Sequence, residues 1–378
     1  MKICLIPQKH WIPVFDSFEN TEVDVLSKSA DVHIFTPWVL DPQKLPPMAR
    51  QNPDYSKVHT IPLPYDKPIF EQPNFFFRPE NLAMDCAIIK EFDPDIIYCL
   101  FAHDPGLMGM MIANELSKPL IVSVFGFDVN VPGGNRDFRI RSILKHADII
   151  RCETDAMKAK LTWFLPEAEQ KIVVVPAAFD PSQYVPGEKG HDSEKEIILL
   201  SINRLIEVKG CIPATQSFIK ALQKNPKLHW RIIGDGPLAS EMIELLEEAG
   251  VRDKVSFFGS VTHEKKLEIL KDADIFYAPY VEGSDGAKDN RPLSCQESFS
   301  MGLPTILGHN MGFDDIGEFT RIAEPGTDAC VEAILELAAN PAMRKEFGEL
   351  ARVYARENLD FNKNCQIILD KIEEVVKK

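Results

Sequence analysis

Short apolar runs rich in valine, isoleucine and leucine alternate along the chain with longer segments in which apolar residues recur at helical spacing. A short apolar run between polar residues predicts a strand that is buried on both faces. The predicted strands are Lys2–Ile6, Asp31–Thr36, Asp95–Leu100, Leu120–Phe125, Asp148–Cys152, Lys171–Val175, Glu196–Ser201, Leu228–Gly234, Val255–Gly259, Asp274–Pro279 and Pro304–Leu307. The helical patterns between them include Gly106–Leu116, Ile140–His146, Ala214–Gln223 and Leu238–Glu248.

This alternation of strands and helices predicts the fold class. Parallel strands joined by helices form a sheet that the helices cover on both faces. The strands fall into two series, separated by the stretch Phe179–Glu196, which is rich in proline, glycine and charge. We therefore expect an α/β protein with two doubly wound, Rossmann-like domains, the N-terminal one over residues 1–185 and the C-terminal one over residues 186–360.

Two parts of the chain depart from the repeating pattern. Residues Trp38–Pro79 are dense in proline, which fits an ordered insertion packed on the first sheet or a lid beside a binding site. The tail from Asn340 to Lys378 predicts two helices, and the apolar side chains of residues 361–378 form a single stripe. Such a stripe predicts that the last helix packs against a domain.

Composition narrows the class of protein. The 378 residues include 42 Lys and Arg against 57 Asp and Glu, a formal net charge of −15, which disfavours binding to nucleic acid or strong docking on anionic lipid. The 8 cysteines are scattered without a C-x-x-C pair, which indicates free thiols in a reducing compartment. Because the N-terminal apolar run is too short for a signal peptide, we expect a cytoplasmic protein with at most peripheral membrane contact.

The second half carries the residues best suited to chemistry. Arg204 and Lys209 follow a predicted parallel strand, and open α/β sheets bind ligands at the carboxyl edge of their strands. One forked and one point-like cation suit a diphosphate. Pro292 predicts a helix start, whose free N–H groups favour an anion. Asp289 precedes that start and Glu297 lies on the helix, an arrangement that suits contacts with a sugar hydroxyl and with a ribose.

The segment GDGPLA, Gly234–Ala239, follows a strand and matches G-x-G-x-x-A, a dinucleotide-binding fingerprint. That fingerprint also requires an acidic residue at the end of the next strand. The next strand ends in Gly259 and Ser260, and Asp253 lies before it. An NAD-dependent dehydrogenase is therefore the weakest of the functions considered.

From about Glu196 to Leu359 the chain resembles the retaining glycosyltransferases of family four, which have the GT-B architecture of two facing Rossmann-like domains. The resemblance rests on five segments in order: S-x-x-R-L-x-x-x-K-G, GDGP, V-x-F-x-G, DIFYAP, and an acidic pair spaced by seven residues before SMGLP. Here the first acid of the pair is Asp289, where the family usually has Glu, and Asn290 replaces the usual Gly. The resemblance also implies that the last helix, residues 361–378, crosses back onto the first domain.

The resemblance implies a role for each matching residue. Arg204 and Lys209 would bind the nucleotide diphosphate, Glu297 the ribose, and Asp289 the donor sugar. The implied donor-binding set also contains Gly234, Asp235, Gly259, Val261, Asn290, Arg291, Pro292 and Leu293. In the first domain the segments FAHDPG and VFGFD occupy acceptor-side positions. The candidate catalytic residues are His103 and Asp128 in this domain and Asp289 in the second. Phe125 stands where relatives often carry a histidine.

The resulting hypothesis is a glycosyltransferase that moves a sugar, with retention of configuration, from a nucleotide sugar to a glycan, lipid-linked or small-molecule acceptor. The nucleotide sugar is a co-substrate of the UDP, GDP or ADP type, and we expect no other cofactor and no metal ion. The main alternative is a non-catalytic protein that binds nucleotide sugars. At single residues, His103 also fits a packed histidine, Asp128 a turn cap, His263 a solvated surface residue, and the pair Asp272 and Asp274 helix and strand caps.

Overall fold

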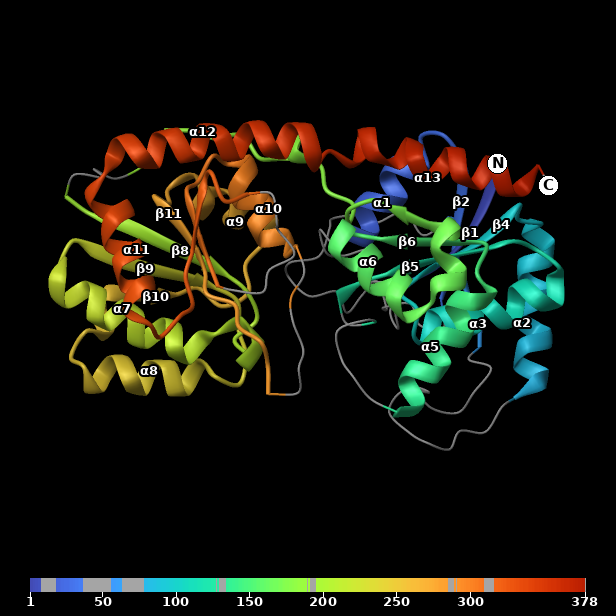
Figure 1. The fold of residues 1–378 in the computed structure, drawn as a ribbon, viewed down its shortest axis with the longest axis horizontal. Coiled ribbons are helices and arrows are strands. Elements are labelled where there is room, and N and C mark those ends of the chain that lie inside the picture. Colours follow the sequence, from blue (N-terminus) through green and yellow to red (C-terminus); the bar gives the residue numbers. More distant parts are fainter. Residues whose placement is uncertain are drawn as a thin grey trace. The chain divides into compact units, whose positions relative to one another are not determined.

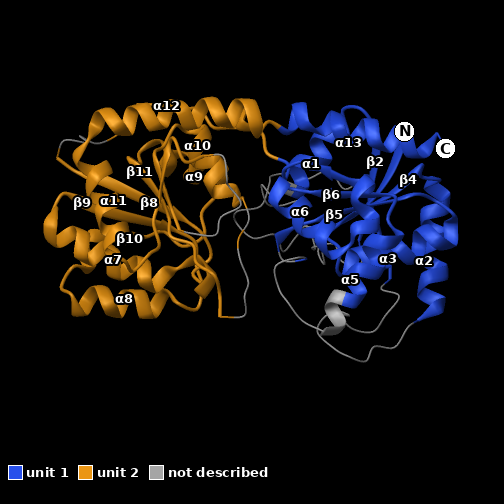
Figure 2. Cartoon of the chain, viewed as in Figure 1, with its two compact units in different colours: residues 1–178, 361–378 blue, residues 179–360 orange. Residues whose placement is uncertain are grey.

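The computed structural model describes residues 1–7, 18–36, 56–62, 78–126, 128, 134–188, 190, 195–284, 289, 291–308 and 316–377. The chain forms two compact units, shown in Figure 2. Unit 1 contains Met1–Ala178 and Phe361–Lys378, and unit 2 contains Phe179–Asp360. The chain therefore passes from unit 1 to unit 2 at the start of the proline- and glycine-rich stretch. It returns to unit 1 between the last two helices.

Unit 1 contains a parallel seven-stranded sheet in the order β3-β2-β1-β4-β5-β6-β7 (Figure 1). Its strands are β1 (Lys2–Ile6), β2 (Asp31–Thr36), β3 (Val58–Thr60), β4 (Ile96–Leu100), β5 (Leu120–Val124), β6 (Ile149–Cys152) and β7 (Ile172–Val174). Its helices are α1 (Phe18–Leu26), α2 (Pro79–Phe92), α3 (Asp104–Leu116), α5 (Gly134–His146), α6 (Asp155–Phe164) and α13 (Phe361–Val376). Because β1 pairs with both β2 and β4, the strand order reverses at β1, as in a doubly wound fold.

Unit 2 contains a parallel six-stranded sheet in the order β10-β9-β8-β11-β12-β13. Its strands are β8 (Ile197–Ile202), β9 (Leu228–Ile233), β10 (Val255–Phe257), β11 (Ile275–Ala278), β12 (Thr305–Leu307) and β13 (Thr320–Ile322). Its helices are α7 (Cys211–Lys224), α8 (Ala239–Glu248), α9 (His263–Lys271), α10 (Leu293–Ser300), α11 (Asp328–Ala339) and α12 (Pro341–Asn358). The strand order reverses at β8, so the predicted fold of two doubly wound, Rossmann-like units is confirmed.

The edge strands β3 and β13 were not predicted. Each has three residues, and neither carries a run of buried apolar side chains, so the pattern that marks the inner strands is absent. Most of Trp38–Pro79, which contains β3, lies outside the described residues. The two interpretations of that segment therefore stay predictions.

Apolar clusters cover both faces of the sheet in unit 1. Helices α2, α3, α5 and α6 contribute to the cluster on one face, and α1 and α13 contribute to the cluster on the other. Phe361, Ile368 and Ile372, from the predicted apolar stripe, are fully buried in the second cluster. Helix α13 therefore belongs to unit 1 although α12, directly before it, belongs to unit 2 (Figure 2).

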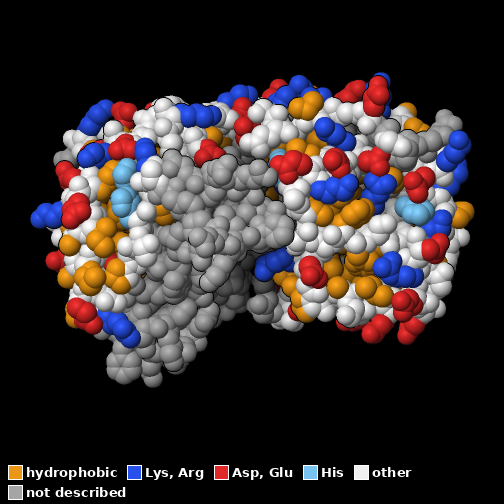
Figure 3. Space-filling view, turned by 180° about the vertical axis from the view of Figure 1, so that it is seen from behind, with side chains coloured by type: hydrophobic (Ala, Val, Ile, Leu, Met, Phe, Trp, Pro, Cys, Tyr) orange, Lys and Arg blue, Asp and Glu red, His pale blue; other side chains and the backbone are white. Residues whose placement is uncertain are grey.

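The described part of the surface mixes charges of both signs. On the face shown in Figure 3, basic and acidic side chains are interspersed with apolar ones. All 8 cysteines are buried, and none forms a disulfide. Among the described helices, none combines the length and apolar character that crossing a lipid bilayer requires.

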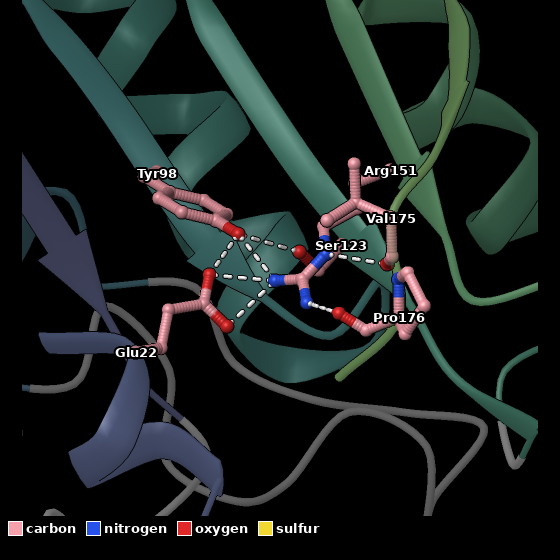
Figure 4. A network of polar contacts seen from close by, with 6 residues as sticks. All are labelled: Glu22, Tyr98, Ser123, Arg151, Val175 and Pro176. Atoms are coloured by element: carbon pink, nitrogen blue, oxygen red, sulfur yellow. Dashed lines mark hydrogen bonds and ion pairs between the residues drawn. The ribbon is translucent and has the colours of Figure 1, made fainter. Parts of the chain in front are cut away.

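A buried polar network joins α1 to the strands of unit 1 (Figure 4). Nη1 of Arg151 lies 2.6 Å from both carboxylate oxygens of Glu22 and 2.8 Å from the Tyr98 hydroxyl, which in turn contacts Glu22 and Ser123. The other guanidinium nitrogens donate to the carbonyls of Val175 and Pro176. Glu22 and Arg151 are 0% and 1% exposed, and each satisfies the other in the interior.

Helix α2 buries a carboxylate that has no such partner. Asp85 is 0% exposed, and neither of its carboxylate oxygens has a hydrogen-bond partner among the described residues. Burial disfavours the charged form and raises the pKa of Asp85 from 3.8 to about 8.

We expect Asp85→Asn to stabilise the protein increasingly as the pH rises. Between the unfolded pKa near 3.8 and the folded pKa near 8, the folded wild type binds the extra proton, so its stability falls with rising pH. The amide avoids this cost, and we expect a gain of at least about 1 kcal/mol at pH 8. Urea denaturation at pH 5 and pH 8 measures it, with Glu80→Gln on the exposed side of α2 as control. An equal effect at both pH values would contradict the explanation.

Candidate functional site

The loop after β8 is held against two other loops at the carboxyl edge of the sheet. Leu205 N–H donates to the Asp235 carbonyl at 2.9 Å, and Val281 N–H donates to the Val208 carbonyl at 3.0 Å. Gly234 adopts φ +125°, and a Cβ there would lie 1.9 Å from the Asn203 carbonyl oxygen. Gly234, the first glycine of GDGP, is therefore required for this close backbone approach, independently of any ligand.

This loop presents two cations in different environments. The Arg204 side chain is exposed, and it forms no hydrogen bond or ion pair with another described residue. Lys209 forms an ion pair with Asp289, and its ammonium lies 4.1 Å from the centre of the Tyr280 ring. The Tyr280 hydroxyl lies 3.0 Å from Ser294 Oγ on α10, so the aromatic support of Lys209 is itself fixed in place.

Helix α10 begins beside this ion pair. Pro292 is the N-cap residue, and Leu293 is the first helical residue. The segment before the helix is held by Gln296, whose amide donates to the Arg291 carbonyl at 3.1 Å. Arg291 has a φ of +29°, an uncommon value for a residue with a side chain. Asn290, whose backbone amide belonged to the predicted set, lies outside the described residues.

Glu297 lies on α10 and is 6% exposed. Its Oε1 accepts a hydrogen bond from Tyr184 at 2.8 Å and forms an ion pair with Lys266 at 2.6 Å. Among the described residues, none donates to Oε2. Burial of this carboxylate does not by itself require a ligand, because Tyr184 and Lys266 already compensate one oxygen. The other oxygen is left as an acceptor.

The remaining donor-side positions lie on loops of the same edge. Gly259 N–H and carbonyl face Gly234 across an isolated bridge, with Gly234 N–H donating to the Gly259 carbonyl at 2.8 Å. Asp235 is exposed and caps the backbone N–H of Gly236 at 2.7 Å. Val261 is half-buried and packs against the core of unit 2.

Electrostatic coupling shows which of these residues lie close together. The buried Cys295 thiol has its pKa raised mainly by desolvation, while Lys209 lowers it and Asp289 and Glu297 raise it. All three charges therefore act on one point of α10. The structure brings together Lys209, Asp289 and Glu297 at the start of this helix, with Arg204 on the adjoining loop.

In unit 1 the predicted acceptor-side residues meet at the ends of β4 and β5. Nδ1 of the buried His103 accepts from the Asp104 N–H at 2.8 Å, so neutral His103 carries its proton on Nε2. The His103 ring packs 5.0 Å from Phe101, which packs 4.6 Å from Phe125. Asp128 Oδ2 accepts from the Phe125 N–H at 3.0 Å, which is the turn-capping contact considered for Asp128.

The D-x-D segment has structural partners. Asp272 forms an ion pair with Arg231 and accepts from the Gly190 N–H, and the 1% exposed Asp274 accepts from the Ile198 N–H at 2.8 Å. These contacts agree with the interpretation of both residues as caps at the entry of β11.

Sequence reasoning missed three side chains at this site, Tyr184, Lys266 and Tyr280. Tyr184 lies in the linker stretch and Lys266 on a polar helix, and no local motif marks either one. The expectation for His263 was wrong, because its ring is half-buried edge-on against Tyr184, with centroids 6.0 Å apart. Only Tyr280, directly after the DIFYAP segment and beside a carboxyl edge, carried a signal by position.

Two family models match successive parts of the chain. The model described as Glycosyltransferase Family 4 matches residues 25–183, and the model described as Glycosyl transferases group 1 matches residues 188–354. A curated relative is the alpha-monoglucosyldiacylglycerol synthase of Streptococcus pneumoniae, 22% identical over 64% of this chain and 57% of its own length. Another is the putative colanic acid biosynthesis glycosyltransferase WcaL of Escherichia coli, 30% identical over 53% of this chain and 49% of its own length.

The chain thus spans about half the length of the curated relatives it matches. A solved structure with a similar fold is Anabaena Alr3699/HepE in complex with UDP, with a TM-score of 0.76, 13% identity and coverage of 99% of this chain and 100% of that one. That likeness extends over both units. Together, the two family models and these relatives show that the chain belongs to the family 4, group 1 glycosyltransferases.

Proposed function

We propose that this protein transfers a sugar from a nucleoside diphosphate sugar to an acceptor hydroxyl, with retention of configuration at the anomeric carbon. The observation that carries the proposal is the pair of cations Arg204 and Lys209 at the carboxyl edge of β8, next to the start of α10. Preorganised cations and helix N–H groups stabilise the negative charge that develops on a departing diphosphate. Retention is an expectation from the family, in which the acceptor is guided by the leaving group on one face of the sugar.

The ion pair between Lys209 and Asp289 supports a specific binding mode. In the structure, the charges of Lys209 and Asp289 compensate each other. A diphosphate brings more negative charge than one carboxylate, so it attracts Lys209 more strongly and releases Asp289. We propose that Asp289 then accepts hydrogen bonds from hydroxyls of the donor sugar.

Glu297 is proposed to anchor the nucleoside. Tyr184 and Lys266 hold its Oε1, while Oε2 is left to accept from a ribose hydroxyl. The expected acceptor side is unit 1, where His103 carries an Nε2 proton and adjoins Asp104. The acceptor is a glycan, a lipid-linked molecule or a small hydroxyl compound.

A transfer assay tests the proposal. The protein is incubated with UDP-, GDP- and ADP-sugars and a panel of hydroxyl acceptors, and NMR follows the anomeric configuration of the product. Because both D-x-D carboxylates have partners within unit 2, we propose that no metal ion is needed and expect transfer to persist in EDTA. Formation of an α-linked product from an α-linked donor supports the proposal. Tight nucleotide-sugar binding without transfer across the panel would favour a non-catalytic binding protein instead.

We predict that Glu297→Gln lowers transfer activity more than Asp289→Glu does. The amide loses the ion pair with Lys266 and weakens the acceptor presented to the ribose, which we expect to cost about 10-fold or more. Asp289→Glu keeps the charge and restores the residue that the family usually has. Initial rates at saturating and limiting donor measure both variants. A larger loss from Asp289→Glu would show that the roles of the two acids are assigned wrongly.

A further inference from the structure

Unit 2 contains a cavity at the edge of the sheet opposite to the candidate donor site. It encloses about 310 Å³ and lies between the end of α9, the residues that enter β11 and β12, and the first turn of α12. Its apolar wall includes Met301 and Leu303, and its charged residues are Lys271, Asp274, Arg344 and Lys345. Parallel strands have distinct ends, so this amino-terminal edge is separated from Arg204 and Lys209 by the length of the strands.

The central charged group in the cavity is a buried arginine. Arg344 is 8% exposed, and its Nη1 donates to the carbonyls of Leu337 and Ala338, both at 2.8 Å. No partner for its Nε or Nη2 occurs among the described residues. Desolvation lowers the pKa of Arg344 more than the nearby Asp274 raises it. Arg344 is therefore largely buried, and among the described residues only its Nη1 has a hydrogen-bond acceptor.

Two lysines add to this positive charge. Lys271 has no ion-pair partner among the described residues, and its stem runs along Gly187, at which an added Cβ would lie 3.5 Å from Cδ. Within the described part of the chain, Lys345 has a single ion-pair contact, which is long and exposed, with Glu349 at 4.0 Å. The one acid in the lining, Asp274, is 1% exposed and bonded to the Ile198 N–H. The lining of the cavity therefore contains three cations and one carboxylate, and this carboxylate already accepts a hydrogen bond from the Ile198 N–H.

The first turn of α12 also contributes to the potential in this cavity. The helix begins at Pro341, which lines the cavity, and its first turn contains no acidic residue. The positive end of the helix dipole is thus not neutralised by its own side chains. The lining of this cavity therefore carries three positive charges and one negative charge in a chain whose formal net charge is −15.

We propose that this cavity binds a small phosphomonoester. A phosphate dianion matches the net charge of the lining and can accept from the free nitrogens of Arg344 and from both lysine ammonium groups. The apolar wall formed by Met301 and Leu303 then contacts the organic part of the ligand. A volume of about 310 Å³ holds a small ligand of this kind, at the lower end of the range for small-molecule pockets.

Isothermal titration with phenyl phosphate tests the proposal, with phenol as the uncharged match and inorganic phosphate as the minimal anion. The 378-residue protein is first saturated with UDP, the expected ligand of the candidate donor site. We expect phenyl phosphate to bind at 1:1 stoichiometry under these conditions and phenol not to bind. Binding of phenyl phosphate to the UDP-free protein but not to the UDP-saturated protein would overturn the proposal, because it would place the anion at the other edge of the sheet.

Variants locate the binding. Lys271→Gln combined with Lys345→Gln removes two exposed charges, and we expect at least tenfold weaker binding with an unchanged melting temperature. The matched control is Lys220→Gln combined with Lys265→Gln, at exposed positions of α7 and α9 outside the cavity. Arg344→Lys changes the buried position, and the same titration with phenyl phosphate measures its affinity as a second test of the site. Equal affinity of the Lys271/Lys345 variant and the wild type would refute the site.

Discussion

Replacing Glu22 by alanine is expected to lower the free energy of unfolding by about 3–5 kcal/mol. Because Arg151 is 1% exposed, the substitution leaves its guanidinium buried with no carboxylate beside it. It also removes a hydrogen-bond partner of Tyr98 and the link from α1 to β4 and β6. Urea denaturation followed by circular dichroism measures the loss.

Two control variants separate the buried pair from ordinary surface effects. Lys371 and Glu374 form an exposed ion pair on α13. Breaking this pair should change the free energy of unfolding by about 1 kcal/mol or less. Glu22→Leu combined with Arg151→Met replaces both charges by apolar groups and should cost less than Glu22→Ala alone. A loss below about 1 kcal/mol for Glu22→Ala would mean that the network contributes little to unit 1.

Arg204→Ala is expected to weaken binding of nucleoside diphosphate by about 10- to 100-fold, because a hydrogen bond to a charged group contributes about 1.5–3 kcal/mol. The Arg204 side chain is exposed and has no bond to another described residue, so the melting temperature of the ligand-free protein should stay within about 1 °C. Isothermal titration with UDP, GDP and ADP measures the affinity, and thermal unfolding measures the stability.

The companion variant Lys209→Ala should weaken binding to a similar extent but should also change stability. It removes the partner of Asp289 and exposes one face of the Tyr280 ring. Arg356→Ala, at an exposed position near the end of α12, is the matched control for Arg204. Unaltered affinity in both Arg204→Ala and Lys209→Ala would refute the assignment of these cations to the phosphates.

The inner strands could be predicted from sequence because their signal is local. Strands such as β4 and β5 are buried on both faces and therefore carry consecutive apolar residues. The edge strands β3 and β13 have three residues each, and long-range pairing rather than their own composition creates them. The membership of α13 in unit 1 was likewise suggested only by the resemblance, since an apolar stripe does not specify the surface that it contacts.

The candidate site likewise contains residues that local sequence predicts and residues that only the fold brings there. Arg204, Lys209, Asp289 and Glu297 stood out because they follow strands or begin a helix at one edge of the sheet. Tyr184 and Lys266 lie 113 and 31 residues from Glu297 in the sequence, so only the fold brings them to its carboxylate. The place of Glu297 on the helix after Pro292 was predicted, but the compensation of its charge by a lysine and a tyrosine was not.

A crystal structure with UDP would show whether the carboxyl edge of the second sheet binds a nucleoside diphosphate. We expect the diphosphate within hydrogen-bonding distance of Arg204 and Lys209, with Asp289 released from Lys209 and the ribose at Glu297. A UDP molecule bound elsewhere, with the contact between Lys209 and Asp289 intact, would contradict it.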